Sequence, residues 1–128
     1  MMIVMISGSR SIKELPQEVI ISLNKIIDLR FEIIVGDAPG VDVKVQQYLK
    51  SQNYQNVTVY YAIFDGNGKP QNSSGFKTVG VPGNYVDRDK QMCSIADYGL
   101  AIWDGKSKGT AANIQRVKLS RKIVVSDT

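Results

Sequence analysis

The chain has 128 residues, of which 43% are hydrophobic and 22% are charged, and its net charge is +4. These values are typical of one globular domain over residues 1–128 and exclude a disordered chain. Because Cys93 is the only cysteine and there is no histidine, we expect no disulfide and no metal site, and nothing in the sequence indicates another cofactor. No apolar run reaches the length of a signal peptide or a membrane span, which predicts a cytoplasmic protein with no membrane partner.

The positive charge is unevenly placed along the chain. Residues 86–122 hold eight basic and four acidic side chains, whereas the remaining residues hold eight of each. The excess is interpreted either as a solvated face or as a surface that binds anions, such as a nucleotide or a nucleic-acid backbone.

Short apolar runs alternate with amphipathic stretches. Strands are predicted over residues 3–7, 31–35, 56–61, 98–103 and 123–125. Helices are predicted to begin at Pro16 and after residue 40, and to span residues 86–96 and 108–120. Apolar strands that alternate with helices predict an α/β fold, a doubly wound parallel sheet of about five strands with helices on both faces.

One long stretch, residues 64–84, has no sustained apolar period and contains five glycines. Loops of this length in compact domains are usually functional. We expect a mobile lid or an oligomer contact that becomes ordered when a ligand or a partner binds.

The ends of the first two predicted strands carry candidate ligand-binding residues, because doubly wound sheets bind ligands beyond the carboxyl ends of their strands. The first strand is followed by Gly8, Ser9 and Arg10, which offer a close backbone approach and hydrogen-bond donors; the alternative is a plain turn with an exposed arginine. The second strand is followed by Gly36, Asp37 and, in the next helical turn, Asp42. Asp42 either contacts a ligand or only stabilises the helix N-terminus.

The end of the fourth predicted strand gives the strongest local signal. Small residues and lysines precede a helix there, so backbone N–H groups, the helix dipole and two cations all favour a phosphate. The alternative is a well-capped helix without a ligand, and the spacing is not that of a Walker A loop. The segment consists of Asp104, Gly105, Lys106, Ser107, Lys108, Gly109 and Thr110.

Arg88 lies in the first turn of the third predicted helix, where a cation is unfavourable for the helix dipole. This placement indicates a role other than helix stability. We expect Arg10 and Arg88 to be exposed and to bind phosphate, and their loss to affect stability little.

With these segments in order, the chain resembles the SLOG (Smf/LOG) superfamily, and within it the short stand-alone branch related to the bacterial YspA-type proteins. The segments that carry the resemblance are residues 6–10, 35–42, 88–92 and 105–110. The resemblance implies a Rossmann-like fold and a nucleotide or nucleotide-derived ligand. The matching pocket positions are Gly8, Ser9, Arg10, Asp42, Arg88, Gly109 and Thr110.

The chain departs from the resembled pattern at two positions. Relatives that are cytokinin-activating phosphoribohydrolases carry a Glu three residues after the Thr, where this chain has Asn113, and Asp89 replaces an Asn at the third helix. An amide cannot act as a carboxylate base, so we expect little or no release of free base from nucleoside monophosphates. A catalytic role would move to another carboxylate, namely Asp37, Asp42 or Asp104.

Three functions remain open at this point. The first is a binding or sensor module for a nucleotide or nucleotide-derived small molecule, with self-association into a homo-oligomer as a further expectation. The second is a nucleotide N-glycosidase, for which Asp104 and Asp42 are the candidate catalytic residues because a chain without histidine must rely on carboxylates. The third is a DNA-associated protein related to DNA-processing protein A, which has the same fold; the modest net charge makes nucleic acid the less favoured partner.

Overall fold

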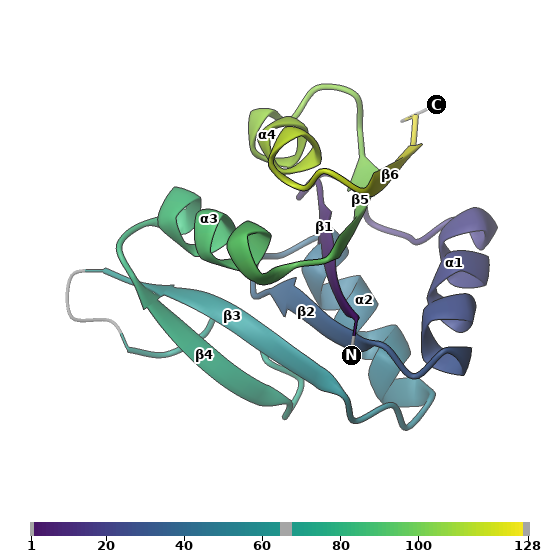
Figure 1. Cartoon of the computed structure of the whole chain (residues 1–128), viewed down its shortest axis with the longest axis horizontal. Coiled ribbons are helices and arrows are strands. Elements are labelled where there is room, and N and C mark those ends of the chain that lie inside the picture. The colour runs from purple at the N-terminus through teal and green to yellow at the C-terminus, as the bar shows by residue number, and fades with distance from the viewer. Residues whose placement is uncertain (1, 65–67, 127–128) are drawn as a thin grey trace.

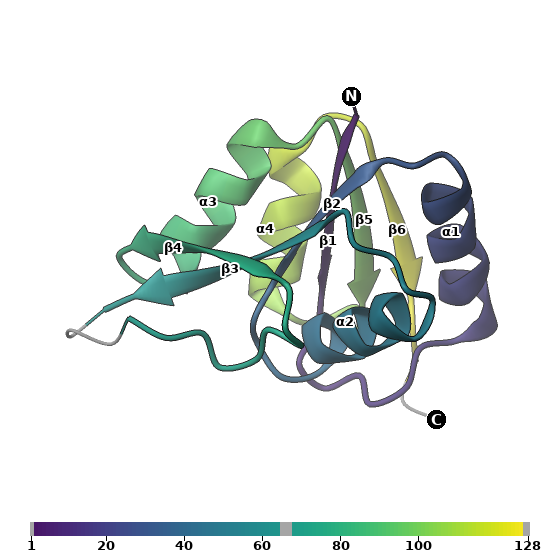
Figure 2. The ribbon, with the colours of Figure 1, turned by 90° about the horizontal axis from the view of Figure 1, so that it is seen from below.

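The computed structural model describes residues 2–64 and 68–126 and places six parallel strands in one sheet between two layers of helices (Figure 1, Figure 2). The strands are β1 (Ile3–Gly8), β2 (Glu32–Gly36), β3 (Val57–Ile63), β4 (Lys77–Pro82), β5 (Tyr98–Trp103) and β6 (Ser120–Val124). The helices are α1 (Gln17–Asp28), α2 (Val41–Ser51), α3 (Tyr85–Ile95) and α4 (Lys108–Arg116). Within the described residues, no helix has the length and apolar character needed to cross a membrane.

Each face of the sheet has its own apolar core. Successive side chains of a strand point to opposite faces, so Val4 and Ile6 of β1 pack with the buried residues of α1 and α2, while Met5 packs with those of α3 and with Val117, directly after α4. Figure 2 shows the two pairs of helices on opposite sides of the sheet. This arrangement confirms the predicted α/β fold, a Rossmann-like, doubly wound parallel sheet covered on both faces.

The strand order is β4-β3-β2-β1-β5-β6. The chain moves outward from β1 through β2 and β3 to β4, and α3 then carries it back across the sheet to β5, on the other side of β1. The direction of winding therefore reverses at β1. In sheets of this class the connections at the carboxyl end of the reversal diverge and leave a crevice.

Both edges of the sheet correct the sequence-based prediction. Residues 77–82, predicted as part of an irregular stretch, form the edge strand β4. The helix predicted to reach residue 120 ends at Arg116, and the other edge strand, β6, begins at Ser120. Edge strands are exposed on one side and tolerate proline and cations. These two strands therefore lack the continuous apolar run that identified the central ones.

The described remainder of the predicted lid, residues 68–76, is attached to the domain. The Asn72 side chain donates a hydrogen bond to the Asp37 carbonyl oxygen. The Gln46 side-chain amide donates to the Asn72 carbonyl oxygen, and its side-chain oxygen accepts from the Ser74 hydroxyl. Residues 65–67 lie outside the described residues. Ordering of this segment by a ligand or partner stays a prediction.

Gly8, the last residue of β1, allows α2 to begin directly against the strand. A Cβ atom at Gly8 would lie 2.4 Å from Cγ1 of Val41, the fully buried first residue of α2. No Cβ atom tolerates this distance, so the absence of a side chain at Gly8 is a packing requirement, independent of any ligand.

We predict that Gly8→Ala lowers the free energy of unfolding by about 1–3 kcal/mol, the range for overpacked interiors. The matched control is Gly109→Ala, since an added Cβ there meets no atom within 4 Å and alanine favours a helix. Urea unfolding measures both. An unchanged urea-unfolding transition in Gly8→Ala would show that β1 and α2 can move apart without loss of stability.

Candidate functional site

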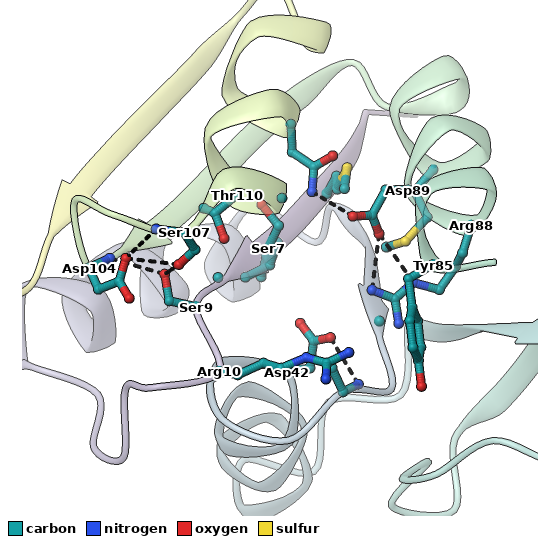
Figure 3. Close-up of a pocket in the computed structure, with 18 of the residues that line it drawn as sticks. Ser7, Ser9, Arg10, Asp42, Tyr85, Arg88, Asp89, Asp104, Ser107 and Thr110 are labelled. Atoms are coloured by element: carbon teal, nitrogen blue, oxygen red, sulfur yellow. Dashed lines mark hydrogen bonds and ion pairs between the residues drawn. The ribbon is translucent and has the colours of Figure 1, made fainter.

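A cavity of about 460 Å³ lies at the carboxyl ends of β1 and β5, where the winding of the sheet reverses (Figure 3). Its walls come from the end of β1 and the loop after it, and from the N-terminal turns of α2, α3 and α4. Segments far apart in the sequence therefore meet around one space. Topology, more than any local motif, creates this site.

Most of the predicted ligand-binding residues line the cavity, which agrees with their predicted placement but does not test binding. These are Gly8, Ser9, Arg10, Gly36, Asp42, Arg88, Asp104, Ser107, Gly109 and Thr110. The other three predicted residues do not line the cavity. Asp37 forms an ion pair with Arg88, Gly105 lies in the turn after β5 with a φ of 82°, and Lys108 is exposed at the start of α4.

The turn between β5 and α4 is fixed by the Asp104 carboxylate. Its Oδ1 accepts hydrogen bonds from the Lys106 and Ser107 backbone N–H groups and from the Ser107 hydroxyl, and Oδ2 accepts one from Ser11. These bonds, the Ser107 backbone bond foremost, hold the pKa of Asp104 well below its usual range. Asp104 is thus a permanent anion engaged in shaping the turn, which favours its structural alternative over a catalytic role.

Ser9 connects this turn to the loop after β1. The Ser9 hydroxyl oxygen accepts a hydrogen bond from the Asp104 backbone N–H at 3.0 Å and lies 2.6 Å from the Ser107 hydroxyl oxygen, with which it shares a hydrogen bond, and the Ser9 side chain is buried. The two walls of the cavity are therefore held in register by side-chain bonds before any ligand arrives (Figure 3).

The first turn of α4 presents free donors to the cavity. Among the described residues, the backbone N–H groups of residues 108–110 find no hydrogen-bond acceptor. Gly109 and Thr110 line the cavity, and the space that a Gly109 side chain would occupy is empty. A helix N-terminus in this state carries partial positive charge and attracts anions.

Arg88 differs from its prediction, because it is buried and already paired. Its Nη1 lies 2.7 Å from Oδ1 of Asp37, and its Nε and Nη2 donate to Oδ1 of Asp89 at 3.2 and 3.0 Å. Only 6% of the residue is exposed. The expectation of an exposed Arg88 is therefore wrong. Its partner lies 51 residues away in the sequence and cannot be inferred locally.

Tyr85 is a cavity residue that the sequence reasoning missed. Its ring centroid lies 4.9 Å from Cζ of Arg10 and 5.1 Å from Cζ of Arg88, and Phe64 packs edge-on against the ring. Arg10 is exposed, as predicted, and makes no ion pair within the described residues. A tyrosine that opens a helix gives no local signal of such an environment.

Asp42 is a buried carboxyl group that lines the cavity. Its Oδ2 accepts the Ala38 backbone N–H at 3.1 Å, and Gly36 has no side chain to obstruct it, since a Cβ atom there would lie 2.5 Å from that oxygen. Burial raises the pKa of Asp42 from its usual 3.8 to about 7, despite the opposing effects of Arg88 and the Ala38 N–H. Asp42 can therefore exchange a proton near neutral pH, whereas a ligand contact by Asp42 stays a prediction.

Asn113 and Asp89 contact each other at the α3–α4 side of the cavity. The Asn113 side-chain amide donates to Oδ2 of Asp89 at 3.1 Å, and its carbonyl oxygen accepts from Arg116 at 3.0 Å. Among the described residues, no group of three or more acidic or cysteine side chains is placed to hold a metal ion.

The basic residues of the C-terminal third are dispersed. Arg116 donates to Asn113, Arg121 to Glu18, and Lys122 lies over the Trp103 ring. Lys106 alone of the five lysines in residues 86–122 lines the cavity. This distribution does not support a continuous nucleic-acid surface.

The chain matches no protein-family model, no curated protein and no solved structure. The resemblance to the SLOG superfamily therefore stays a prediction. The function has to be argued from the cavity itself.

We predict that Arg88→Met lowers the free energy of unfolding by about 3–5 kcal/mol, because it leaves Asp37 buried without its partner. The matched control is Arg121→Met, which breaks an exposed pair with Glu18 and costs about 1 kcal/mol or less. Urea unfolding at pH 7 measures both. Equal, small decreases in the free energy of unfolding of the two variants would contradict a stabilising role of the buried Arg88–Asp37 pair.

Asp42 makes stability depend on pH. The folded protein holds the Asp42 proton more tightly than the unfolded chain, so its stabilising effect is complete below about pH 4 and is lost as the pH rises to about 7. The loss amounts to about 4 kcal/mol. We predict that Asp42→Asn, which cannot ionise, is stabilised relative to wild type at pH 8, and that this advantage shrinks towards pH 4.5.

Thermal unfolding at the two pH values checks this prediction. The exposed Asp28, at the end of α1, provides the matched control Asp28→Asn. A difference between wild type and Asp42→Asn that stays constant from pH 4.5 to 8 would contradict the raised pKa.

Proposed function

We propose that the cavity binds a small molecule carrying a phosphate group, a nucleotide or a nucleotide derivative, and that the protein acts as a binding or sensor module for it. The observation that carries the proposal is the first turn of α4, whose free N–H groups at residues 108–110 lie beside a cavity lined by Gly109. Backbone donors and the helix dipole act together on an anion in this position.

The surrounding charges and the size of the cavity support the proposal. Arg10 and Lys106 line the cavity as cations without ion pairs among the described residues. Arg88 is neutralised by Asp37 and Asp89, so the phosphate is assigned to the N-terminus of α4, and Arg10 and Lys106 add positive charge to the cavity. A volume of about 460 Å³ falls within the range of about 300–1,000 Å³ for small-molecule sites.

The bonds among Ser9, Asp104 and Ser107 also favour binding. They hold the α4 turn in one conformation, so little ordering entropy is lost when a ligand arrives. Self-association of the protein stays a prediction, and the proposal does not depend on it.

We predict that Gly109→Val weakens the binding of AMP at least about tenfold, since the valine side chain occupies the space against the α4 N–H groups and removes charge-assisted hydrogen bonds. Calorimetry measures the affinity. The control variant Gln115→Val adds the same side chain to an exposed position of α4.

Adenosine serves as the control ligand because it lacks the phosphate, and we expect it to bind much more weakly than AMP. Unchanged AMP affinity in folded Gly109→Val, or equal affinities for AMP and adenosine, would refute the phosphate site.

A further inference from the structure

The two ends of the cavity differ in charge. At the α4 end, Asp104 is the only carboxylate among the described lining residues, and its oxygens are engaged by hydrogen-bond donors of the turn. At the opposite end, three carboxyl groups, from Asp37, Asp42 and Asp89, surround the guanidinium of Arg88, and Arg10 lies over the Tyr85 ring that Arg88 also contacts. A ligand with an anionic group at α4 therefore meets hydrogen-bond acceptors at its other end.

Asp42 is the member of this acidic cluster with an oxygen left for a ligand. Asp37 uses Oδ1 for Arg88 and Oδ2 for the Gln71 backbone N–H, and Asp89 uses Oδ1 for Arg88 and Oδ2 for Asn113. Oδ2 of Asp42 accepts from Ala38, whereas its Oδ1 accepts no hydrogen bond from the described residues.

The position of Asp42 directs that free oxygen to the cavity. The residue is 5% exposed yet lines the cavity, and Figure 3 shows its carboxyl group pointing into the open centre, below Ser7 and Thr110. Among the described residues no fully buried side-chain oxygen lacks a hydrogen-bond partner, so this oxygen is open to the cavity, and a ligand group that donates a hydrogen bond to it gains free energy.

We propose that the Asp42 carboxyl group binds a hydroxyl group of the ligand's sugar, so that the cavity takes ribose phosphates and ribonucleotides in preference to their deoxy forms. This inference rests on the phosphate site proposed above. In other doubly wound sheets an acid near the second strand holds the ribose hydroxyls of a nucleotide. Here Asp37 directly follows β2 but is occupied, and Asp42 is the available acid near that strand.

A hydroxyl group fits Asp42 better than an amine does. With a pKa of about 7, the Asp42 carboxyl group is protonated in some molecules and ionised in others at neutral pH. A hydroxyl group can donate a hydrogen bond to the ionised form or accept one from the protonated form. An ammonium group pairs only with the anion and meets the positive charge of Arg88 beside it.

The test is calorimetry at pH 7 with AMP, 2′-deoxy-AMP and 3′-deoxy-AMP as probes. Wild type is expected to bind AMP at least about tenfold more tightly than one of the deoxy nucleotides. The folded variant Asp42→Asn keeps the shape of the side chain but loses the carboxyl group, and we expect its preference to fall to about twofold or less. The control Asp28→Asn, on an exposed turn of α1, keeps the wild-type preference.

The outcomes separate this inference from the phosphate site. Wild-type affinities for all three nucleotides within about twofold of one another, with binding still lost in Gly109→Val, would overturn the role of Asp42 and leave the phosphate site intact. An undiminished preference in Asp42→Asn would overturn it as well. No binding of any of the three would overturn both proposals. The wild-type comparison decides the question even if Asp42→Asn does not fold.

Discussion

The ion pair between Arg88 and Asp37 is the interaction on which the site depends. It joins α3 to the end of β2, and through the second oxygen of Asp37 it also holds Gln71 of the connection to β4. Gly36 leaves room for it, because a Cβ atom there would lie 2.8 Å from Cζ of Arg88. The pair therefore helps to fix the first turn of α3 against the end of β2, where Arg88 forms part of the cavity wall.

The same ion pair also limits which cations of the cavity are available to a phosphate. An arginine that is already neutralised by Asp37 and Asp89 has little charge to offer a phosphate, so the proposed function assigns the anion to the N-terminus of α4. Burial raises the pKa of Asp42 towards neutrality, and the positive charge of Arg88 opposes this rise. Arg88 therefore influences the charge of Asp42 as well as that of its own partners.

How far the sequence predicts this site depends on how far apart along the chain the interacting residues lie. The β5–α4 turn was predictable because Asp104, Ser107 and Gly109 lie within six residues and their roles follow from helix-end physics. The central strands were predictable from their apolar runs, whereas the edge strands β4 and β6 lack such runs. The burial of Arg88 and the environment of Tyr85 arise from contacts between distant segments, which no local pattern encodes.

The two positions at which the chain departs from the resembled patterns, Asn113 and Asp89, are neighbours in the structure. Asn113 stands where the resembled phosphoribohydrolases carry a Glu, and Asp89 stands where the related branch has an Asn, yet the Asn113 amide donates directly to the Asp89 carboxylate. This side of the cavity therefore keeps a carboxylate, which comes from Asp89 on α3. A Glu at position 113 would bring a second carboxylate against Asp89 and be repelled by it. Asn113 thus does not leave the cavity without acidic groups: Arg88 neutralises Asp89, and Asp42 remains the carboxyl group that can exchange a proton near neutral pH.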